Sequence, residues 1–393
     1  MTSPQIVQCA HNRSRGIFFL HGAGFASWVP HIPLVQKRLD LGHDDLGFAL
    51  LAAAVGVLVA MPIAGRLADR VGSKRVVRYS GLAYFPALTI PLFMRSLSTL
   101  SIALFVMGFT ATFMDIAMNA NGLNVERARG KSVMSGLHGF WSLGGFTGAG
   151  FAALWFALPI PEMWHLPVSM AGLLALHWSL QRNLLPDPTR TLKTLETPNP
   201  SRGRTMVWVL LPFGICAFIG QFGEGVITDW ATVLMNTHLH SGPTMAAVGF
   251  ACYSAAMAMT RLSGDWLANR FGRTAVLMGS SGLATTGYLT LALAPHYIIA
   301  WMGCFIAGVG LAVVLPLLIS AAAGVTGKAG GAVVTAIAAT GYTALMAGPP
   351  IIGAIGQHYG LVSAFLITSG FLAMIIPVYM LTIRSRLKTV GER

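Results

Sequence analysis

The stretch GRLADRVGSK, residues 65–74, ends one apolar segment and leads into the next, and a second copy, GDWLANRFGR, does the same at residues 264–273. The tetrads DRVG and NRFG within these copies begin at residues 69 and 269, an offset of 200 residues. Gly108 and Gly308 keep the same offset in two later apolar segments. The chain therefore contains two related halves.

The composition is that of a chain that folds in a membrane. Of the 393 residues, 54% are apolar and 10% are charged, whereas an ordinary soluble domain has roughly 25% charged residues. A helix needs about 20 mostly apolar residues to cross a bilayer. The sequence therefore predicts an all-α polytopic membrane protein with 12 transmembrane helices, near residues 17–36, 46–65, 76–94, 99–122, 132–156, 163–181, 207–234, 244–266, 274–294, 297–320, 331–356 and 360–383.

The net charge of +13 is distributed according to membrane topology. If the N-terminus is cytoplasmic, all 26 lysines and arginines except Lys37, Arg38, Arg95 and Arg261 fall on the cytoplasmic side. This asymmetry follows the positive-inside rule and predicts that both termini are cytoplasmic. The basic residues thus indicate topology and contact with anionic lipid, and we expect no nucleic-acid partner.

A polar segment divides the predicted spans into two sets of six. The stretch LPDPTRTLKTLETPNPSRGRT, residues 185–205, has four prolines and no apolar period, which is typical of an extended linker. The predicted organisation is a cytoplasmic tail at 1–16, a six-helix bundle at 17–184, a cytoplasmic linker at 185–206, a second six-helix bundle at 207–383 and a cytoplasmic tail at 384–393. The repeat predicts that the two bundles are pseudo-symmetric, an arrangement typical of secondary transporters.

The first copy of the repeated stretch lies between spans two and three, its weaker copy lies between spans eight and nine, and a basic linker follows span six. In this combination the sequence resembles the major facilitator superfamily over essentially the whole chain. The resemblance implies the fold of that superfamily and secondary transport by alternating access.

The residues of the first copy are candidates for a gating motif. Gly65 and Gly72 are expected to permit close helix approach and a tight turn. Asp69 can accept hydrogen bonds or face a helix N-terminus of the opposite half, while Arg70 and Lys74 can anchor at the lipid surface. The alternative is an ordinary positively charged loop, and the position and repetition of the motif favour a gating role.

Further stretches resemble the fucose-type proton symporters of this superfamily and their uncharacterised bacterial relatives. They are MDIAMNANG at residues 114–122, TRLSGDWLANRFG at 260–272, LPLLISAAAG at 315–324 and GAVVTAIAATGYTALMAGPPIIG at 331–353. This resemblance implies proton-coupled symport of a sugar or a related polar metabolite. Those symporters also carry an acid on the first helix, whereas the corresponding stretch FASWVPHIP, residues 25–33, has none.

Span five contains a series of small residues. The stretch HGFWSLGGFTGAG, residues 138–150, has glycines at 139, 144, 145, 148 and 150. Drug antiporters of the superfamily typically show a GPxxGG motif on this helix, and the proline of that motif is missing. The glycines are nevertheless expected to allow tight packing against a neighbouring helix.

Asp115 lies in the middle of an apolar span. An ionised carboxylate is costly in hydrocarbon, so intramembrane acids are usually functional. Asp115, Asn119 and Gly122 share one helix face, which predicts a polar stripe toward a central cavity. Asp115 is therefore a proton-coupling candidate, and Asn119 can hydrogen-bond to either of its protonation states. The alternative is that Asp115 is a structural tie between helices.

The same pattern gives further candidates on other spans. Glu224 shares a helix face with Gln221 and is the second proton-coupling candidate. Arg261 precedes Asp265 by four residues, a spacing suited to an ion pair that steadies the cytoplasmic gate. His138 and the asparagines have structural alternatives, as an interfacial residue and as interhelical ties. The predicted substrate cavity comprises Asn119, Asn121, Trp28, His138, Trp141, Gln221 and Trp230.

The sequence contains no HExxH, GxSxG or GxxxxGK motif and no paired Cys or His at metal spacing. We therefore expect no enzyme activity, catalytic residue, metal site or cofactor. The prediction is a monomeric transporter in the inner (plasma) membrane that binds a small-molecule substrate and protons at a site formed by spans one, four, five, seven, eight, ten and eleven. Proton-coupled symport is the first reading; export by antiport, and a sensor that kept the fold without transport, are the alternatives.

Overall fold

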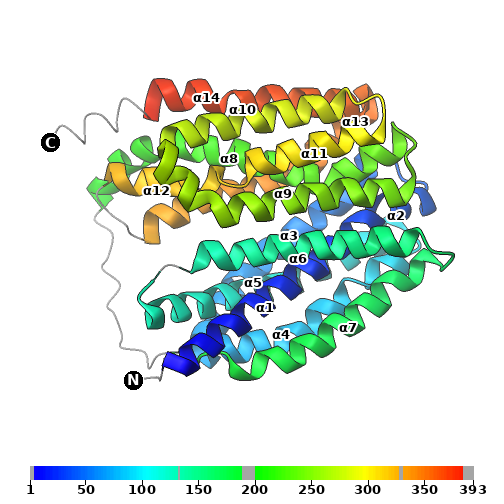
Figure 1. Ribbon diagram of the computed structural model, residues 1–393. Helices are drawn as coiled ribbons and strands as arrows, with labels where there is room; N and C mark the ends of the chain where they lie inside the picture. The colour runs from blue at the N-terminus through cyan, green and yellow to red at the C-terminus, as the bar shows by residue number, and fades with distance from the viewer. Residues whose placement is uncertain (1–3, 132, 188–199, 327–330, 384–393) are drawn as a thin grey trace.

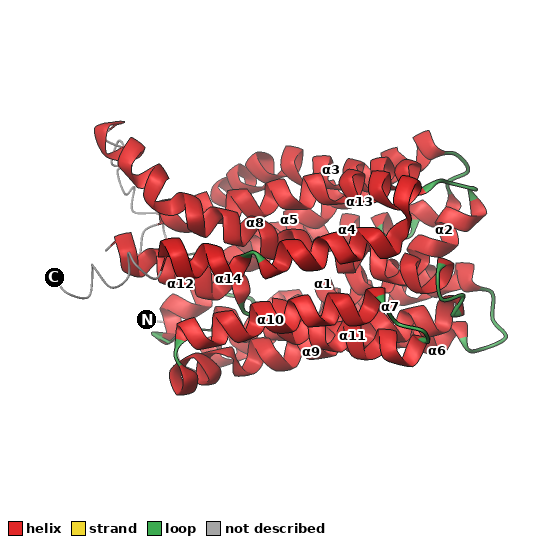
Figure 2. Cartoon of the chain, turned by 90° about the horizontal axis from the view of Figure 1, so that it is seen from above, coloured by secondary structure: helices red, strands yellow, loops and turns green. Residues whose placement is uncertain are grey.

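The computed structural model describes residues 4–131, 133–187, 200–326 and 331–383. Within these residues every regular element is helical, and the long helices run roughly along one common axis (Figures 1 and 2). The predicted all-α fold is confirmed. We call the end of the bundle that holds Pro4, Gly72 and Gly130 the proximal face, and the end that holds Asp40 and His240 the distal face (left and right in Figure 1).

The first half forms six spans that alternate in direction. Span one consists of α1 (Pro4–Trp28), η1 (Val29–His31) and α2 (Ile32–Arg38), span two of α3 (His43–Val71), span three of α4 (Ser73–Ala87) and η2 (Ile90–Phe93), span four of α5 (Leu97–Arg129), span five of α6 (Met134–Phe156), and span six of η3 (Glu162–Trp164), α7 (His165–Leu180) and η4 (Gln181–Asn183). Because α1 begins at Pro4, residues 4–16 of the expected N-terminal tail are helical and extend α1 beyond the predicted start of the membrane span at residue 17.

The second half repeats this arrangement. Span seven is α8 (Pro200–Thr237), span eight α9 (Gly242–Phe271), span nine α10 (Arg273–Ala292), and span ten α11 (Tyr297–Leu311) followed by α12 (Val314–Thr326). Spans eleven and twelve together form α13 (Gly331–Ala373), α14 (Ile375–Val378) and η5 (Tyr379–Ile383), and the change of direction inside α13 is at Gly360, whose φ of 80° is non-helical. The helix α8 begins at Pro200, inside the expected linker. Residues 188–199 of that linker, and the expected C-terminal tail at 384–393, lie outside the described residues.

Six of the described helical segments are long and apolar enough to cross a membrane individually. The other spans are shorter, such as α4 with 15 residues, or more polar, such as α1, which carries Arg13 and Arg15. Helices α8 to α14 lie together over α1 to α7 (Figure 1). The two halves meet along two seams, α3 against α13 and α6 against α9.

The repeated motif forms the same turn in both halves. Gly72 has φ 93° and ψ 140°, and Gly272 has φ 82° and ψ 144°. Positive φ is the region that glycine adopts without a steric cost, so both turns require it. The close helix approach expected at Gly65 is wrong, because no atom of a neighbouring element lies within 4 Å of the position of a Cβ there.

The glycines of span five bring α6 against α1. A Cβ on Gly144 would lie 2.0 Å from the carbonyl oxygen of Phe19, and one on Gly148 would lie 2.2 Å from that of Ala23. Gly150, on the same helix, has nothing within 4 Å. Tight packing of this helix is therefore made by Gly144 and Gly148 through direct backbone contact.

We predict that Gly144→Ala lowers the thermal stability of the purified protein, because the methyl group forces α1 and α6 apart at a cost of about 1–3 kcal/mol. Gly150→Ala is the matched control on the same helix and should leave the melting temperature unchanged or raise it slightly. Equal melting temperatures for the two variants would show that the backbone contact at Gly144 does not support the fold.

Candidate functional site

A cavity of about 730 Å³ lies between the two halves, with Met134 and Ser135 of the first turn of α6 at its proximal rim. Its walls come from α1, α5 and α6 in the first half and from α8, α9, α11, α12 and α13 in the second. These elements belong to the spans that the sequence predicted to form the site. The polar and aromatic side chains on the walls are His21, Asp115, Ser135, His138, Trp141, Gln221, Glu224, Arg261 and Tyr342.

On the first-half wall, Asp115 is half-buried on α5. The side-chain amide of Asn119 donates to Oδ1 of Asp115 at 3.1 Å and to the carbonyl oxygen of Asp115 at 2.9 Å. No lysine or arginine of the described residues forms an ion pair with Asp115. The carboxyl group thus faces the cavity with an amide as its side-chain partner.

His21 is a cavity residue that the sequence analysis did not single out. The indole Nε1–H of Trp141 donates to Nδ1 of His21 at 2.9 Å, and the His21 ring stacks on Tyr84 at 4.6 Å between centroids. Because an indole can only donate, Nδ1 must be an unprotonated acceptor, so a neutral His21 carries its proton on Nε2. The sequence feature that could have identified His21 is a polar, titratable side chain within the apolar run GIFFLHG, residues 16–22.

On the second-half wall, Arg261 forms an ion pair with Glu224, with 3.1 Å between Nη2 and Oε1. Its Nη1 donates to the hydroxyl of Ser142, across the boundary between the halves, at 3.0 Å. The side chain of Asp265 lies outside the described residues, so the expected pair of Arg261 with Asp265 along α9 stays a prediction. Both side chains of the Arg261–Glu224 pair are partly buried, and the attraction between opposite charges is stronger there than on an exposed helix surface.

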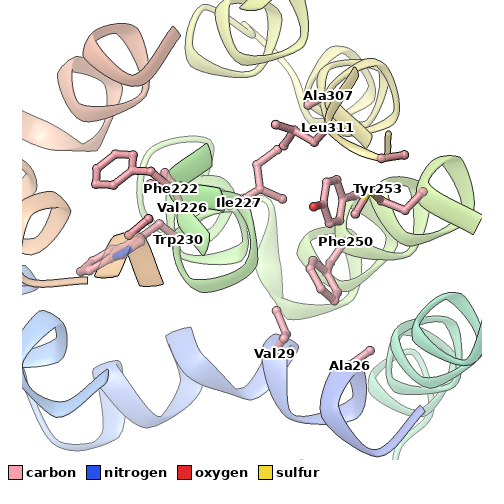
Figure 3. Packing of buried hydrophobic residues seen from close by; sticks show 14 of the residues in the cluster. Ala26, Val29, Phe222, Val226, Ile227, Trp230, Phe250, Tyr253, Ala307 and Leu311 are labelled. Carbon is pink, nitrogen blue, oxygen red and sulfur yellow. The ribbon is translucent and has the colours of Figure 1, made fainter. Parts of the chain in front are cut away.

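Three of the predicted cavity residues lie elsewhere. Trp28 and Trp230 are buried in the apolar core, and Figure 3 shows Trp230 beside Val226 on the side of α8 turned away from Tyr253. Asn121 is buried and donates to the carbonyl of Leu185 at 2.8 Å and to the hydroxyl of Ser73.

These placements correct the predicted assignment of Trp28, Trp230 and Asn121 to the cavity. Asn121 follows Asn119 by two residues, a rotation of about 200° around the helix, so the two side chains cannot share a face. Asn121 is an interhelical tie, the alternative that the sequence left open. His138, Trp141 and Gln221 do line the cavity, while Asn119 reaches it through Asp115.

The proposed gating residues gather at the proximal end of α3 and the start of α4. Asp69 and Arg70 are exposed and Lys74 is half-buried. A carboxylate oxygen of Asp187, from the segment after η4, lies 2.8 Å from the position of a Cβ on Gly72, so the turn is packed against the start of the linker. A gating role for these residues stays a prediction.

The two halves are in direct contact on the distal side of the cavity. The backbone N–H of His43 donates to Oε1 of Gln357 at 2.9 Å, which joins α3 to α13. The hydroxyl of Thr232 donates to the carbonyl of Val29 at 3.4 Å, which joins α8 to η1. We call these contacts the distal seal. They separate the cavity from a second space of about 770 Å³ at the distal face, lined in part by Lys37, Glu162 and His240.

Comparisons with known proteins agree with this architecture. The family model described as Major Facilitator Superfamily matches residues 16–345 and 213–392. The chain is 33% identical to an uncharacterized MFS-type transporter of Yersinia pestis, covering 90% of each protein, and 31% identical to an uncharacterized transporter of Sinorhizobium fredii, covering 91% of this chain and 94% of the relative.

Solved structures share the fold. The crystal structure of the nucleoside transporter NupG has a TM-score of 0.70 at 12% identity, covering 95% of this chain and 98% of that one. A bacterial homolog of the human lysosomal transporter Spinster has a TM-score of 0.71 at 16% identity, covering 98% and 99%.

We predict that the Glu224–Arg261 pair stabilises this arrangement of the two halves. Glu224→Gln and Arg261→Gln should each lower the melting temperature, because each leaves a partly buried charge without its partner. The double variant should lose less than the sum of the single variants, with a coupling energy of roughly 0.5–3 kcal/mol. Additive losses in this double-mutant cycle would mean that the two side chains do not stabilise each other.

Proposed function

The chain belongs to the major facilitator superfamily of secondary transporters, and we propose that it moves a small polar solute across the inner membrane together with protons, using Asp115 as the proton-binding group. The observation that carries the proposal is the position of Asp115. Of the described carboxylates that line the cavity, Glu224 is neutralised by Arg261, whereas Asp115 has only an amide partner. An unneutralised acid in a membrane interior is costly unless it binds a proton or a cation.

The two cavities support transport by alternating access. The cavity that contains Asp115 has its rim toward the proximal face, at Met134 and Ser135, and the second space lies beyond the distal seal. We infer that the proximal face is cytoplasmic, because the basic residues of the turns at Gly72 and Gly272 lie there. Rocking of the halves would open the distal seal and close the proximal rim around the same polar groups.

Coupling follows if the proton and the solute each bind one conformation preferentially. Binding of one then changes the affinity for the other by the same factor. In symport, solute binds better to the form with Asp115 protonated. The hydrogen-bonding groups of His21, Gln221 and Tyr342 suit a sugar-like or similarly polar solute.

A second candidate is exchange of protons for a cationic solute. With Glu224 paired to Arg261, the remaining formal charge on the cavity wall is that of Asp115, and aromatic faces of Trp141 and Tyr342 line the same space. An ammonium group is attracted both to a carboxylate and to aromatic faces. In that case the proton and the solute compete for Asp115, which corresponds to export by antiport.

We predict that Asp115→Asn abolishes solute accumulation driven by a pH gradient in reconstituted vesicles while sparing solute binding and counterflow exchange. The amide mimics the protonated acid but cannot release a proton. The solute is first chosen by a thermal-shift screen over sugars, organic acids, amino acids and cationic drugs. Asp40→Asn, the same change at an exposed acid of the distal face, is the matched control and should accumulate solute like the wild type.

Accumulation at the wild-type level by Asp115→Asn would make Asp115 a structural tie and leave Glu224 as the next proton-coupling candidate. The pH dependence of binding to the wild-type protein separates the two modes. Solute affinity that rises as the pH falls indicates symport, because the solute then binds better when Asp115 is protonated. Affinity that falls with the pH indicates competition between a cation and the proton.

A further inference from the structure

A cluster of basic side chains lies at the proximal face, apart from the cavity. It consists of His11 and Arg15 on α1 and Arg129 near the end of α5. A guanidinium nitrogen of Arg129 contacts Nδ1 of His11. Arg15 follows His11 by one helical turn and so shares its face of α1. The guanidinium of Arg15 lies over the ring of Phe140 on α6, 5.1 Å from the ring centroid.

The two arginines of this cluster are only partly solvated. His11 is 4% exposed, Arg15 and Arg129 are half-buried, and Nε of Arg15 is buried without a hydrogen-bond acceptor among the described residues. Removing a guanidinium from water is costly when no anion or acceptor replaces the water. The cluster therefore has unmet capacity to donate hydrogen bonds.

No carboxylate in the described parts of the chain forms an ion pair with Arg15 or Arg129. The acid nearest to Arg129 along α5 is Glu126, and its Oε2 accepts instead from the backbone N–H groups of Val133 and Met134, at 2.8 and 3.2 Å. The carboxylate of Glu126 thus binds the backbone N–H groups at the N-terminus of α6, where a negative charge is favourable. The charge of the two arginines is left unbalanced.

His11 does not supply the missing anion and adds no charge of its own. Burial, followed by the neighbouring charges of Arg15 and Arg129, lowers the pKa of His11 to about 4. At neutral pH the ring is therefore uncharged, and its Nδ1 accepts from Arg129. The imidazole holds Arg129 in place beside the α1 side chains.

We propose that Arg15 and Arg129 bind a phosphate group at the proximal face. Two guanidinium groups with free N–H donors match the geometry of phosphate oxygens, which they bind through paired hydrogen bonds. Arg15 lies just before the predicted start of span one at residue 17, which places the cluster at the depth of lipid headgroups. The same chemistry would also bind inorganic phosphate from solution, and the experiment separates these two sources.

The test measures the melting temperature of the detergent-purified full chain with added phosphatidylglycerol, phosphatidylcholine or inorganic phosphate. The variant Arg15→Gln/Arg129→Gln removes both guanidinium groups. The control Arg75→Gln/Arg127→Gln removes the same charge from two exposed arginines at the same face. Phosphatidylglycerol is expected to raise the melting temperature of the wild type and the control by several degrees, and to have at most half that effect on the variant.

Stabilisation of the wild type and control by inorganic phosphate, lost in the variant, would assign the site to a soluble phosphate group. Equal stabilisation of the variant and the control, or no stabilisation of the wild type by either probe, would overturn the proposal.

A second measurement needs no substitution and follows the titration of His11 in the isotopically labelled wild type. Arg15 and Arg129 flank His11, so an anion bound between them must favour the imidazolium and raise the pKa of His11. An unchanged His11 titration on adding phosphatidylglycerol or phosphate would also overturn it.

Discussion

A polar group inside a bilayer has to find its partner within the protein, because hydrocarbon offers none. The interior of this bundle satisfies that requirement in two different ways. Glu224 and Arg261 satisfy each other, and Arg261 also reaches Ser142 in the opposite half. Asp115 has Asn119 as its side-chain hydrogen-bond partner among the described residues, and a bound proton or cation would balance its charge. This difference between the two acids is the basis of the proposal that Asp115, and not Glu224, exchanges a proton during transport.

The distal seal lies between the cavity that holds Asp115 and the second space at the distal face. Beside the hydrogen bonds of the distal seal, the rings of His43 and Trp230 meet edge to face across the two halves, 6.1 Å between centroids, and backbones also come into contact. A Cβ on Gly47 would lie 2.6 Å from the carbonyl oxygen of Pro349. Buried apolar side chains of the two halves also pack together, as Val29 of the first half and Phe250 of the second do in Figure 3. By contrast, the backbone contacts of Gly144 and Gly148 join α6 to α1 inside one half. Rigid halves with a separable contact are what a rocking motion requires.

Much of the fold and part of the site could be predicted from the sequence. The repeated stretch predicted two related halves. It could be recognised because the turn needs positive φ at Gly72 and at Gly272, which favours glycine at both positions. Helical spacing placed Asp115, Gln221 and Glu224 on the cavity wall. Helical spacing could not indicate the pair of Arg261 with Glu224, because this partner lies on another helix, α8.

The remaining errors concern aromatic and amide side chains, which occur both in cores and in polar cavities. Trp230 and Trp28 are packed in the core, and Asn121 joins helices, although their residue types also suit a binding site. His21 was overlooked because its place in the cavity depends on Trp141, which lies far away in the sequence. Partners of this kind come from the packing of helices and not from the pattern along any one of them.

Infrared difference spectroscopy of the protein in lipid, recorded between two pH values, observes the carboxyl groups themselves. If Asp115 is the group that binds the coupling proton, a protonated carboxyl band appears as the pH falls through the range in which transport changes. That band should be absent from Asp115→Asn and shifted when a transported solute is added. A band that persists in Asp115→Asn, or a carboxylate that stays ionised throughout that range, would contradict the role assigned to Asp115.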